Sequence, residues 1–352
     1  ALQPRSPHRL KCRATQLRVV PQDPTIKPRP LAALAHRDFR LLFAAQPLIL
    51  VGSGMRNVAN AFQVYQLTGD ARLLGLTFLF QGIPALAMGL IGGSLADLFD
   101  RRRLLQVVVT LEAILVTALA LLTIWGHVEV WHIYVVTFCC ALLDSVTSPA
   151  QQALMTKVVP DKDLMNATAL RSTTGQAAQL VGPLLGGAAL QVLGAGVVYV
   201  ANAVMLVPAF IVLTLLHVRS DPERKRPKLN LAFIFDGVLF VLKTPALLAF
   251  TLLDTVTMVL GFYPAMMPVF AKDALGVGAA GLGALLSAPA FGAMLGFLGV
   301  LMLGNVQRRG LVILSVTVAH AVALLLFAQS TWLTMALFLA AMLGFLDSLS
   351  VT

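Results

Sequence analysis

The fold is decided by a short charged stretch, GSLADLFDRRR, which occupies residues 93–103. A long apolar run at about 73–98 ends within this stretch, and another at about 104–126 follows it directly. A helix of about 20 apolar residues is long enough to cross the hydrocarbon core of a bilayer. The stretch is therefore predicted to be a short loop between two membrane-spanning helices.

The same alternation of apolar run and charged loop extends through most of the chain. The 352 residues are 58% hydrophobic and 12% charged, whereas a soluble domain has about half apolar and about a quarter charged residues. Because unpaired backbone cannot cross lipid, runs this long must be helices. The sequence predicts an all-α polytopic membrane protein with about ten spans. They fall at about 41–67, 73–98, 104–126, 130–157, 164–193, 196–218, 246–271, 278–304, 310–328 and 331–352.

The distribution of positive charge predicts how the chain crosses the membrane. Almost all of the 26 Lys and Arg residues fall in segments on one side. The exceptions are Arg72 and Lys272 on the other side, and Arg56 and Arg171 inside spans. Cytoplasmic loops are enriched in Lys and Arg, so the N-terminus is predicted to be cytoplasmic. The net charge of +10 is then a topology signal, and no nucleic-acid partner is expected.

The residue patterns of common enzymes and metal proteins are missing from the sequence. Its three cysteines, Cys12, Cys139 and Cys140, have no metal-ligand spacing and are too few for a disulfide framework. The chain contains no Gly-x-Ser-x-Gly, no His-Glu-x-x-His and no Walker loop. We therefore expect neither an enzyme nor a bound metal or cofactor.

The lengths of the loops divide the chain into two halves. Residues 1–36 form a basic, proline-rich tail that is predicted to be cytoplasmic and disordered, and residues 37–218 hold six spans. Residues 219–245 are predicted to form a central cytoplasmic loop with an interfacial helix. Residues 246–352 form the second half of the chain.

A weak internal repeat supports this division. The segment MGLIGG at 88–93 and the segment MLGFLG at 294–299 are each followed by a pair of arginines at the same distance. Membrane carriers are often built from duplicated halves. We therefore expect a fold of six plus six helices, of which this chain would lack the last two.

Two motifs resemble those of the major facilitator superfamily. The segment 93–103 resembles the family's signature between its second and third helices, Gly-x-Leu-Ala-Asp-x-x-Gly-Arg-Arg, with Asp100 at the position that is commonly Gly. The segment Gly182-Pro183-Leu-Leu-Gly186-Gly187 resembles a motif of the exporting branches. Together with the segments 36–40 and 159–167, these motifs place the resemblance in the enterobactin-exporter-like and drug-efflux branch.

The resemblance implies roles for both motifs. Gly93, Asp97, Arg101 and Arg102 would form a cytoplasmic latch between the halves, although the arginines could also serve only the charge rule of membrane topology. Asp97 and Arg101 are four residues apart, a spacing that places side chains on one helix face. The second motif is expected to act as a hinge or as a face for close helix packing. Its small and helix-bending residues are Gly182, Pro183, Gly186 and Gly187.

Ionisable residues inside the spans are the candidates for coupling transport to protons. Charges are expensive in a bilayer and usually mark function. Asp144 is the deepest acid of the first half, and Arg56 could pair with it or with Glu112 across the bundle. A structural ion pair is the alternative. Asp254 in the seventh span is a further candidate, although a solvated position near the end of its span would also explain it.

These observations predict a secondary active transporter. The resemblance implies a proton-coupled exporter of amphiphilic small molecules, of the drug or siderophore class, that works by alternating access. The alternative is a non-transporting receptor or sensor built on a carrier fold. The expected partners are a small-molecule substrate, protons and the lipid bilayer, and the expected state is a monomer in the inner or plasma membrane.

Overall fold

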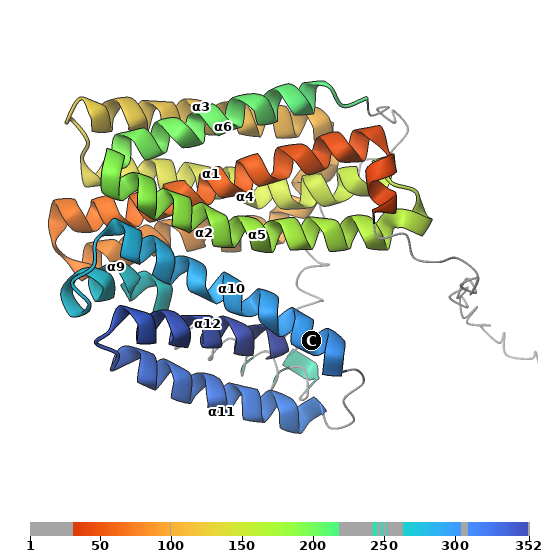
Figure 1. Ribbon diagram of the computed structural model, residues 1–352. Coiled ribbons are helices and arrows are strands. Elements are labelled where there is room, and N and C mark those ends of the chain that lie inside the picture. The colour runs from red at the N-terminus through yellow and green to blue at the C-terminus, as the bar shows by residue number, and fades with distance from the viewer. Residues whose placement is uncertain are drawn as a thin grey trace, which may run out of the picture.

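The computed structural model describes residues 31–98, 100–217, 242–244, 248, 252, 263–303 and 309–350. Within these residues the only regular structure is helical, and the predicted all-α polytopic fold is confirmed. The elements (Figure 1) are η1 (Ala32–Ala35), α1 (Arg37–Thr68), α2 (Ala71–Leu98), α3 (Arg101–Ile124), α4 (Val130–Val158), α5 (Asp161–Leu193), α6 (Ala195–Thr214), η2 (Tyr263–Met266), α9 (Met267–Val269), η3 (Phe270–Ala274), α10 (Ala279–Leu303), α11 (Arg309–Ala328) and α12 (Leu333–Ser350).

Each apolar run that was predicted to span has a helix in the structure, apart from the run at 246–271, most of which lies outside the described residues. The described end of that run is broken into three short pieces: the 3₁₀ turn η2, the short α9 and the π-helical turn η3. Pro264 and Pro268 stand in this segment. Proline has no backbone N–H to donate, so a continuous α-helix is disfavoured there.

Six of the described helices are long and apolar enough to cross a membrane: α1, α2, α3, α4, α6 and α10. The helix α5 has 33 residues but is less apolar, because its first half is rich in polar and charged residues. The helices α11 and α12 contain shorter apolar stretches, Leu314–Ala328 and Leu333–Leu349.

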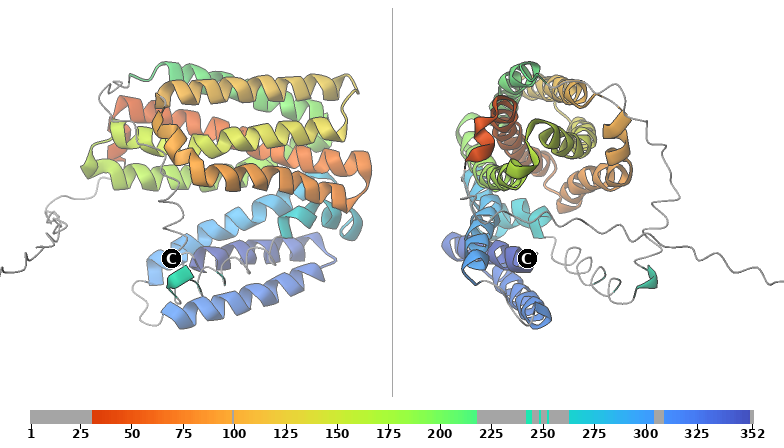
Figure 2. Two further views of the ribbon diagram at one scale, coloured as in Figure 1. Left: turned by 180° about the vertical axis from the view of Figure 1, so that it is seen from behind. Right: turned by 90° about the vertical axis from the view of Figure 1, so that its right-hand side faces the viewer.

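The helices α1 to α6 form one bundle, and α10, α11 and α12 pack together beside it (Figures 1 and 2). Within the bundle, α1 packs against α5 and α6, α3 packs against α6, and α2 packs against α4. The helices α5 and α10 lie side by side and carry the main contact between the two groups. This arrangement leaves α5 with neighbours in both groups.

The residues just before α1 belong to the packed structure. Ala32–Ala35 form η1, in which Ala33 is fully buried and its backbone N–H donates to Asn166 Oδ1 on α5 at 3.2 Å. The tail predicted at 1–36 therefore ends before these residues, and residues 1–30 lie outside the described part. The predicted boundaries at 219–245 also fall mainly on residues outside it, so the division into domains stays a prediction.

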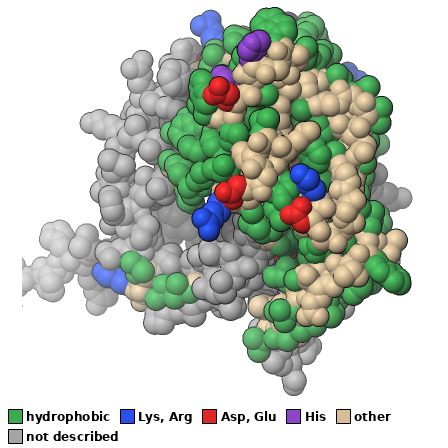
Figure 3. Space-filling model, turned by 90° about the vertical axis from the view of Figure 1, so that its left-hand side faces the viewer, with side chains coloured by type: hydrophobic (Ala, Val, Ile, Leu, Met, Phe, Trp, Pro, Cys, Tyr) green, Lys and Arg blue, Asp and Glu red, His purple; other side chains and the backbone are tan. Residues whose placement is uncertain are grey.

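The two ends of the bundle differ in charge. The end that carries the loop after α2 and the loop after α4 holds the arginine triplet 101–103, and we call it the basic end. The opposite end, which carries the α1–α2 and α3–α4 loops, faces the viewer in Figure 3 and shows scattered charged side chains among hydrophobic and uncharged ones. Arg72 and Lys272 lie at this opposite end. The orientation of these ends in the membrane stays a prediction.

Candidate functional site

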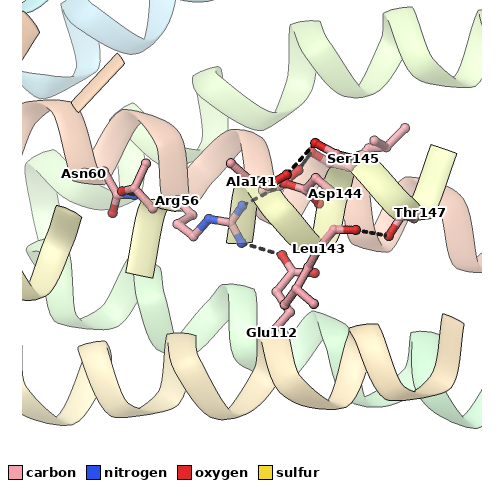
Figure 4. A network of polar contacts seen from close by, with 11 residues as sticks. Arg56, Asn60, Glu112, Ala141, Leu143, Asp144, Ser145 and Thr147 are labelled. Atoms are coloured by element: carbon pink, nitrogen blue, oxygen red, sulfur yellow. Dashed lines mark hydrogen bonds and ion pairs between the residues drawn. The ribbon is translucent and has the colours of Figure 1, made fainter. Parts of the chain in front are cut away.

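A buried cluster of three charged side chains lies inside the first bundle (Figure 4). Arg56 extends from α1, and its side chain is only 3% exposed. Its guanidinium donates to a carboxylate oxygen of Glu112 on α3, and its Nη2 lies 3.4 Å from Asp144 Oδ2 on α4. The pairing that the sequence predicted for Arg56 with either acid is therefore present with both.

The two acids of this cluster differ in their exposure. The Glu112 side chain is 1% exposed, whereas the Asp144 side chain is 43% exposed. One guanidinium can neutralise one carboxylate, so the cluster carries an excess negative charge when both acids are ionised. Burial makes such a charge costly, and taking up one proton would remove it. Asp144 is the acid that a proton can reach.

A row of polar side chains continues along α1 from this cluster. Asn60 Nδ2 donates to Thr137 Oγ1 on α4 at 3.1 Å. Gln63 accepts a hydrogen bond of 2.8 Å from the hydroxyl of Tyr199 on α6. Arg56, Asn60 and Gln63 have the spacing of one helix face. Sequence reasoning missed Asn60 and Gln63, although polar residues at this spacing within an apolar run were the available signal.

A cavity of about 350 Å³ lies between the two groups of helices. It is lined from one group by α1, α2, α4 and α5, and from the other by η2, α9 and α10. Its apolar lining includes Phe78 and the prolines 183, 264, 268 and 289. None of the described residues that line it is ionisable. The polar side chains of the lining include Asn57, Asn60, Thr77, Gln81, Thr137 and Gln179.

The two groups of helices are joined by polar contacts at the end opposite the basic end. The Tyr65 hydroxyl, near the end of α1, donates to Asp273 Oδ2 in η3 at 2.5 Å. Lys272 Nζ lies 4.9 Å from the centroid of the same tyrosine ring, a distance typical of a cation–π contact. Gln191 on α5 accepts from the backbone N–H of Ala280 on α10 at 3.4 Å. These contacts join the halves at this end.

The glycines of the second motif let α5 approach a neighbour on each side. A Cβ atom at Gly186 would lie 2.7 Å from the Met55 Cα on α1, and Gly182 faces the same helix. A Cβ atom at Gly187 would lie 2.7 Å from the Gly283 Cα on α10. Real Cβ atoms do not come this close, so these positions require glycine. The predicted packing face is present on both sides, and a hinge role for the motif stays a prediction.

Pro183, in the same motif, lies inside α5 and lines the cavity. Its carbonyl oxygen lies against Gly283, next to the close contact between α5 and α10. The motif therefore shapes the wall of the cavity as well as the contact between the two groups of helices.

The arginines of the predicted latch bind backbone carbonyls within the first bundle. Arg101 Nη1 donates to the Ala153 carbonyl on α4 at 2.8 Å. Arg102 Nε donates to the Leu213 carbonyl at 3.2 Å, and its Nη2 donates to the Thr214 carbonyl. These are carbonyls of the last turn of α6, which have no partner within that helix. Arg102 therefore caps α6 and its positive charge faces the negative end of the helix dipole.

Asp100, which departs from the common signature, caps the start of α3. Its Oδ1 accepts from the backbone N–H groups of Arg102 at 3.0 Å and Arg103 at 3.2 Å. Aspartate is a favoured residue at this position of a helix. Gly93 and Asp97 lie in the last turns of α2, but their side chains are outside the described part, as is Asp254. The latch and the role of Asp254 stay predictions.

The sequence matches the family model described as "Transmembrane secretion effector" over residues 28–351. The enterobactin exporter EntS of Shigella flexneri is 28% identical over 320 residues, which cover 90% of this chain and 75% of that protein. The enterobactin exporter EntS of Salmonella choleraesuis (strain SC-B67) is 27% identical over 318 residues, which cover 90% of this chain and 76% of that protein.

Solved transporter structures share the fold at low sequence identity. A bacterial homologue of the human lysosomal transporter Spinster, inward-facing and unoccupied, aligns with a TM-score of 0.67 and 18% identity over 90% of this chain and 74% of that one. A bacterial homologue of the iron transporter ferroportin, inward-facing, aligns with a TM-score of 0.62 and 17% identity over 89% of this chain and 81% of that one. The chain is therefore a multi-pass membrane transporter that belongs to the transmembrane secretion effector family of the major facilitator superfamily.

Proposed function

We propose that the chain is a proton-coupled exporter of amphiphilic small molecules of the siderophore or drug class. The cluster of Arg56, Glu112 and Asp144 carries the coupling part of the proposal, because it holds one cation against two acids. The cargo part is supported by relatives that are named as exporters of enterobactin. We further propose that the chain works as a monomer in the bacterial inner membrane with its N-terminus in the cytoplasm.

Protonation of Asp144 would change how α1 is held. With Asp144 ionised, Arg56 is shared between α3 and α4. With Asp144 protonated, the charge-assisted part of the contact to α4 is lost, and the remaining pair with Glu112 is neutral overall. Because α1 also carries cavity residues such as Asn57 and Asn60, the change reaches the substrate site along one helix.

Alternating access requires two states in which the cavity opens to opposite sides. Contacts at Tyr65 and Gln191 join the halves at the end opposite the basic end. In the proposed cycle these contacts break when the halves rock, and contacts at the basic end form in their place. The similarity to two structures in inward-facing states is in accord with this assignment of the ends.

The test is transport of labelled enterobactin by the full chain in proteoliposomes with an imposed pH gradient. Wild type should accumulate the label against its gradient. Asp144→Asn should abolish accumulation driven by protons, yet retain exchange of labelled for unlabelled substrate, because exchange needs no net proton movement. Asp161→Asn is the matched control, since Asp161 is exposed at the start of α5, and it should behave like wild type.

Two results would contradict parts of the proposal. If Asp144→Asn accumulated the label like wild type, coupling through this acid would be wrong. If wild type bound enterobactin but moved none in either direction, the alternative of a receptor or sensor on a carrier fold would be favoured. Failure to bind or move enterobactin, with transport of lipophilic drugs intact, would shift the cargo class from siderophores to drugs.

A further inference from the structure

Two buried polar atoms in the wall of the cavity have no hydrogen-bond partner among the described residues. They are Oδ1 of Asn60 on α1 and Oγ1 of Thr77 on α2. Asn60 is 2% exposed and Thr77 is 6% exposed. Buried polar groups are nearly always hydrogen-bonded in proteins, because leaving one without a partner destabilises the fold. Two such atoms in one cavity wall indicate a place where a ligand supplies the partners.

The direction of the missing hydrogen bonds follows from the chemistry of these groups. The Asn60 amide is held by the bond from its Nδ2 to Thr137 Oγ1, which leaves its oxygen as an acceptor. The Thr77 hydroxyl can either donate or accept. A ligand that satisfies both must therefore carry at least one hydrogen-bond donor, such as a hydroxyl or an amide N–H.

The charge of the cavity restricts the ligand further. None of the described residues that line it is ionisable. One turn along α1 from Asn60 lies Arg56, which is already engaged by the carboxylates of Glu112 and Asp144. An anionic group entering the cavity would lose its hydration without meeting a free cation in the described part of the chain. An uncharged group meets no such penalty.

The size and apolar lining of the cavity complete the description of the ligand. A volume of about 350 Å³ is near the lower end of the roughly 300–1,000 Å³ typical of small-molecule sites. The four prolines and Phe78 offer flat apolar surface for an aromatic ring. The cavity therefore suits one aromatic group, either a small molecule or one arm of a larger amphiphile.

We propose that Asn60 and Thr77 form a specificity subsite that takes the substrate as an uncharged aromatic group with a hydroxyl donor, and that it disfavours ionised groups. This inference rests on the proposed function, since it names the form in which the exporter takes its cargo. It adds two residues and a charge state that the coupling cluster does not determine.

Equilibrium binding to the purified full chain tests the subsite without any gradient. The probes are a radiolabelled, uncharged N-butyl catechol amide, its dimethyl ether, and its sulfonate derivative, which is a permanent anion. Wild type should bind the catechol amide roughly three- to tenfold more tightly than the dimethyl ether, as expected for a lost neutral hydrogen bond. It should bind the sulfonate more weakly than the uncharged catechol amide.

Thr77→Val is the decisive variant, because it replaces a hydroxyl that has no partner in the fold by a methyl group of similar size. Its melting temperature without ligand should not fall below that of wild type. Its affinity for the catechol amide should drop roughly three- to tenfold, while its affinity for the dimethyl ether should not change. Thr77→Ser keeps the hydroxyl and should retain the preference for the catechol amide.

Thr147→Val on α4 is the matched control, since Thr147 is buried, donates to the Leu143 carbonyl at 2.9 Å and does not line the cavity. It should leave the preference unchanged. The subsite is refuted if Thr77→Val keeps the wild-type preference, or if wild type binds the sulfonate as tightly as the uncharged amide. Binding as expected without any transport would instead refute the proposed function and leave the subsite standing.

Discussion

Removing the hydroxyl of Tyr65 should open the end of the protein that is opposite the basic end. This hydroxyl donates to Asp273 Oδ2 at 2.5 Å and joins α1 of the first bundle to η3 of the second group. A hydrogen bond to a charged group contributes about 1.5–3 kcal/mol. Since the Asp273 carboxylate of Tyr65→Phe can regain water, we expect to lose about 1–2 kcal/mol of the preference for the closed end. That corresponds to a shift of roughly 5- to 30-fold in the equilibrium between the two states.

The assay is labelling of a single cysteine in the cavity by a membrane-impermeant thiol reagent applied from the side opposite the basic end. The native cysteines are replaced by alanine, and Asn57→Cys supplies the reporter on α1. Tyr65→Phe and Asp273→Asn should each raise the labelling rate from that side, within the same range. Tyr134→Phe is the matched control, because that hydroxyl donates to the Leu73 carbonyl at 2.7 Å within the first bundle.

The reasoning would be refuted if Tyr65→Phe labelled at the wild-type rate while expression and folding were normal. It would also be refuted if Tyr134→Phe raised the rate as much as Tyr65→Phe did. In the first case the contact would be incidental to closure. In the second case loss of any buried tyrosine hydroxyl would loosen the bundle.

Two further predictions concern the motifs. Gly187→Val should abolish transport, because its Cβ would lie 2.6 Å from the Ala279 carbonyl oxygen and force α10 away; Gly75→Val on α2, where a Cβ meets nothing within 4 Å, should transport normally in the same vesicle assay. Arg102→Ala should lower the unfolding free energy by about 1–3 kcal/mol, through the loss of its bonds to the last carbonyls of α6. Arg103→Ala, at an exposed position, should lower it by less than about 0.5 kcal/mol, and thermal unfolding in detergent measures both.

The sequence was sufficient to predict which segments become helices and which charges meet. Runs of apolar residues report the need to satisfy the backbone in lipid, and that need is local to each run. The pairing of Arg56 with acids on α3 and α4 could be predicted because an isolated charge inside a span needs a partner, and the deep acids of neighbouring spans were few.

Other features depend on how helices turn about their axes, which apolar runs specify poorly. The hydrogen bond between Tyr65 and Asp273 joins residues 208 positions apart, and nothing in either segment marks the other as its partner. Thr77 looks like an ordinary mid-span threonine until α1, α2 and α4 are assembled around it. Arg102 fitted the charge rule of membrane topology, and only the position of α6 shows that it also caps a helix.

The glycines of α5 constrain how the halves of this transporter can move against each other. At Gly187 and Gly283 backbone meets backbone, with no side chains between them that could slide or exchange rotamers. Two smooth rods in such contact can roll about their line of touch, but a shift along that line would drive neighbouring side chains into main-chain atoms. The line between α5 and α10 is therefore the natural axle of the rocking motion, and the ends of the molecule travel farthest because they lie farthest from it.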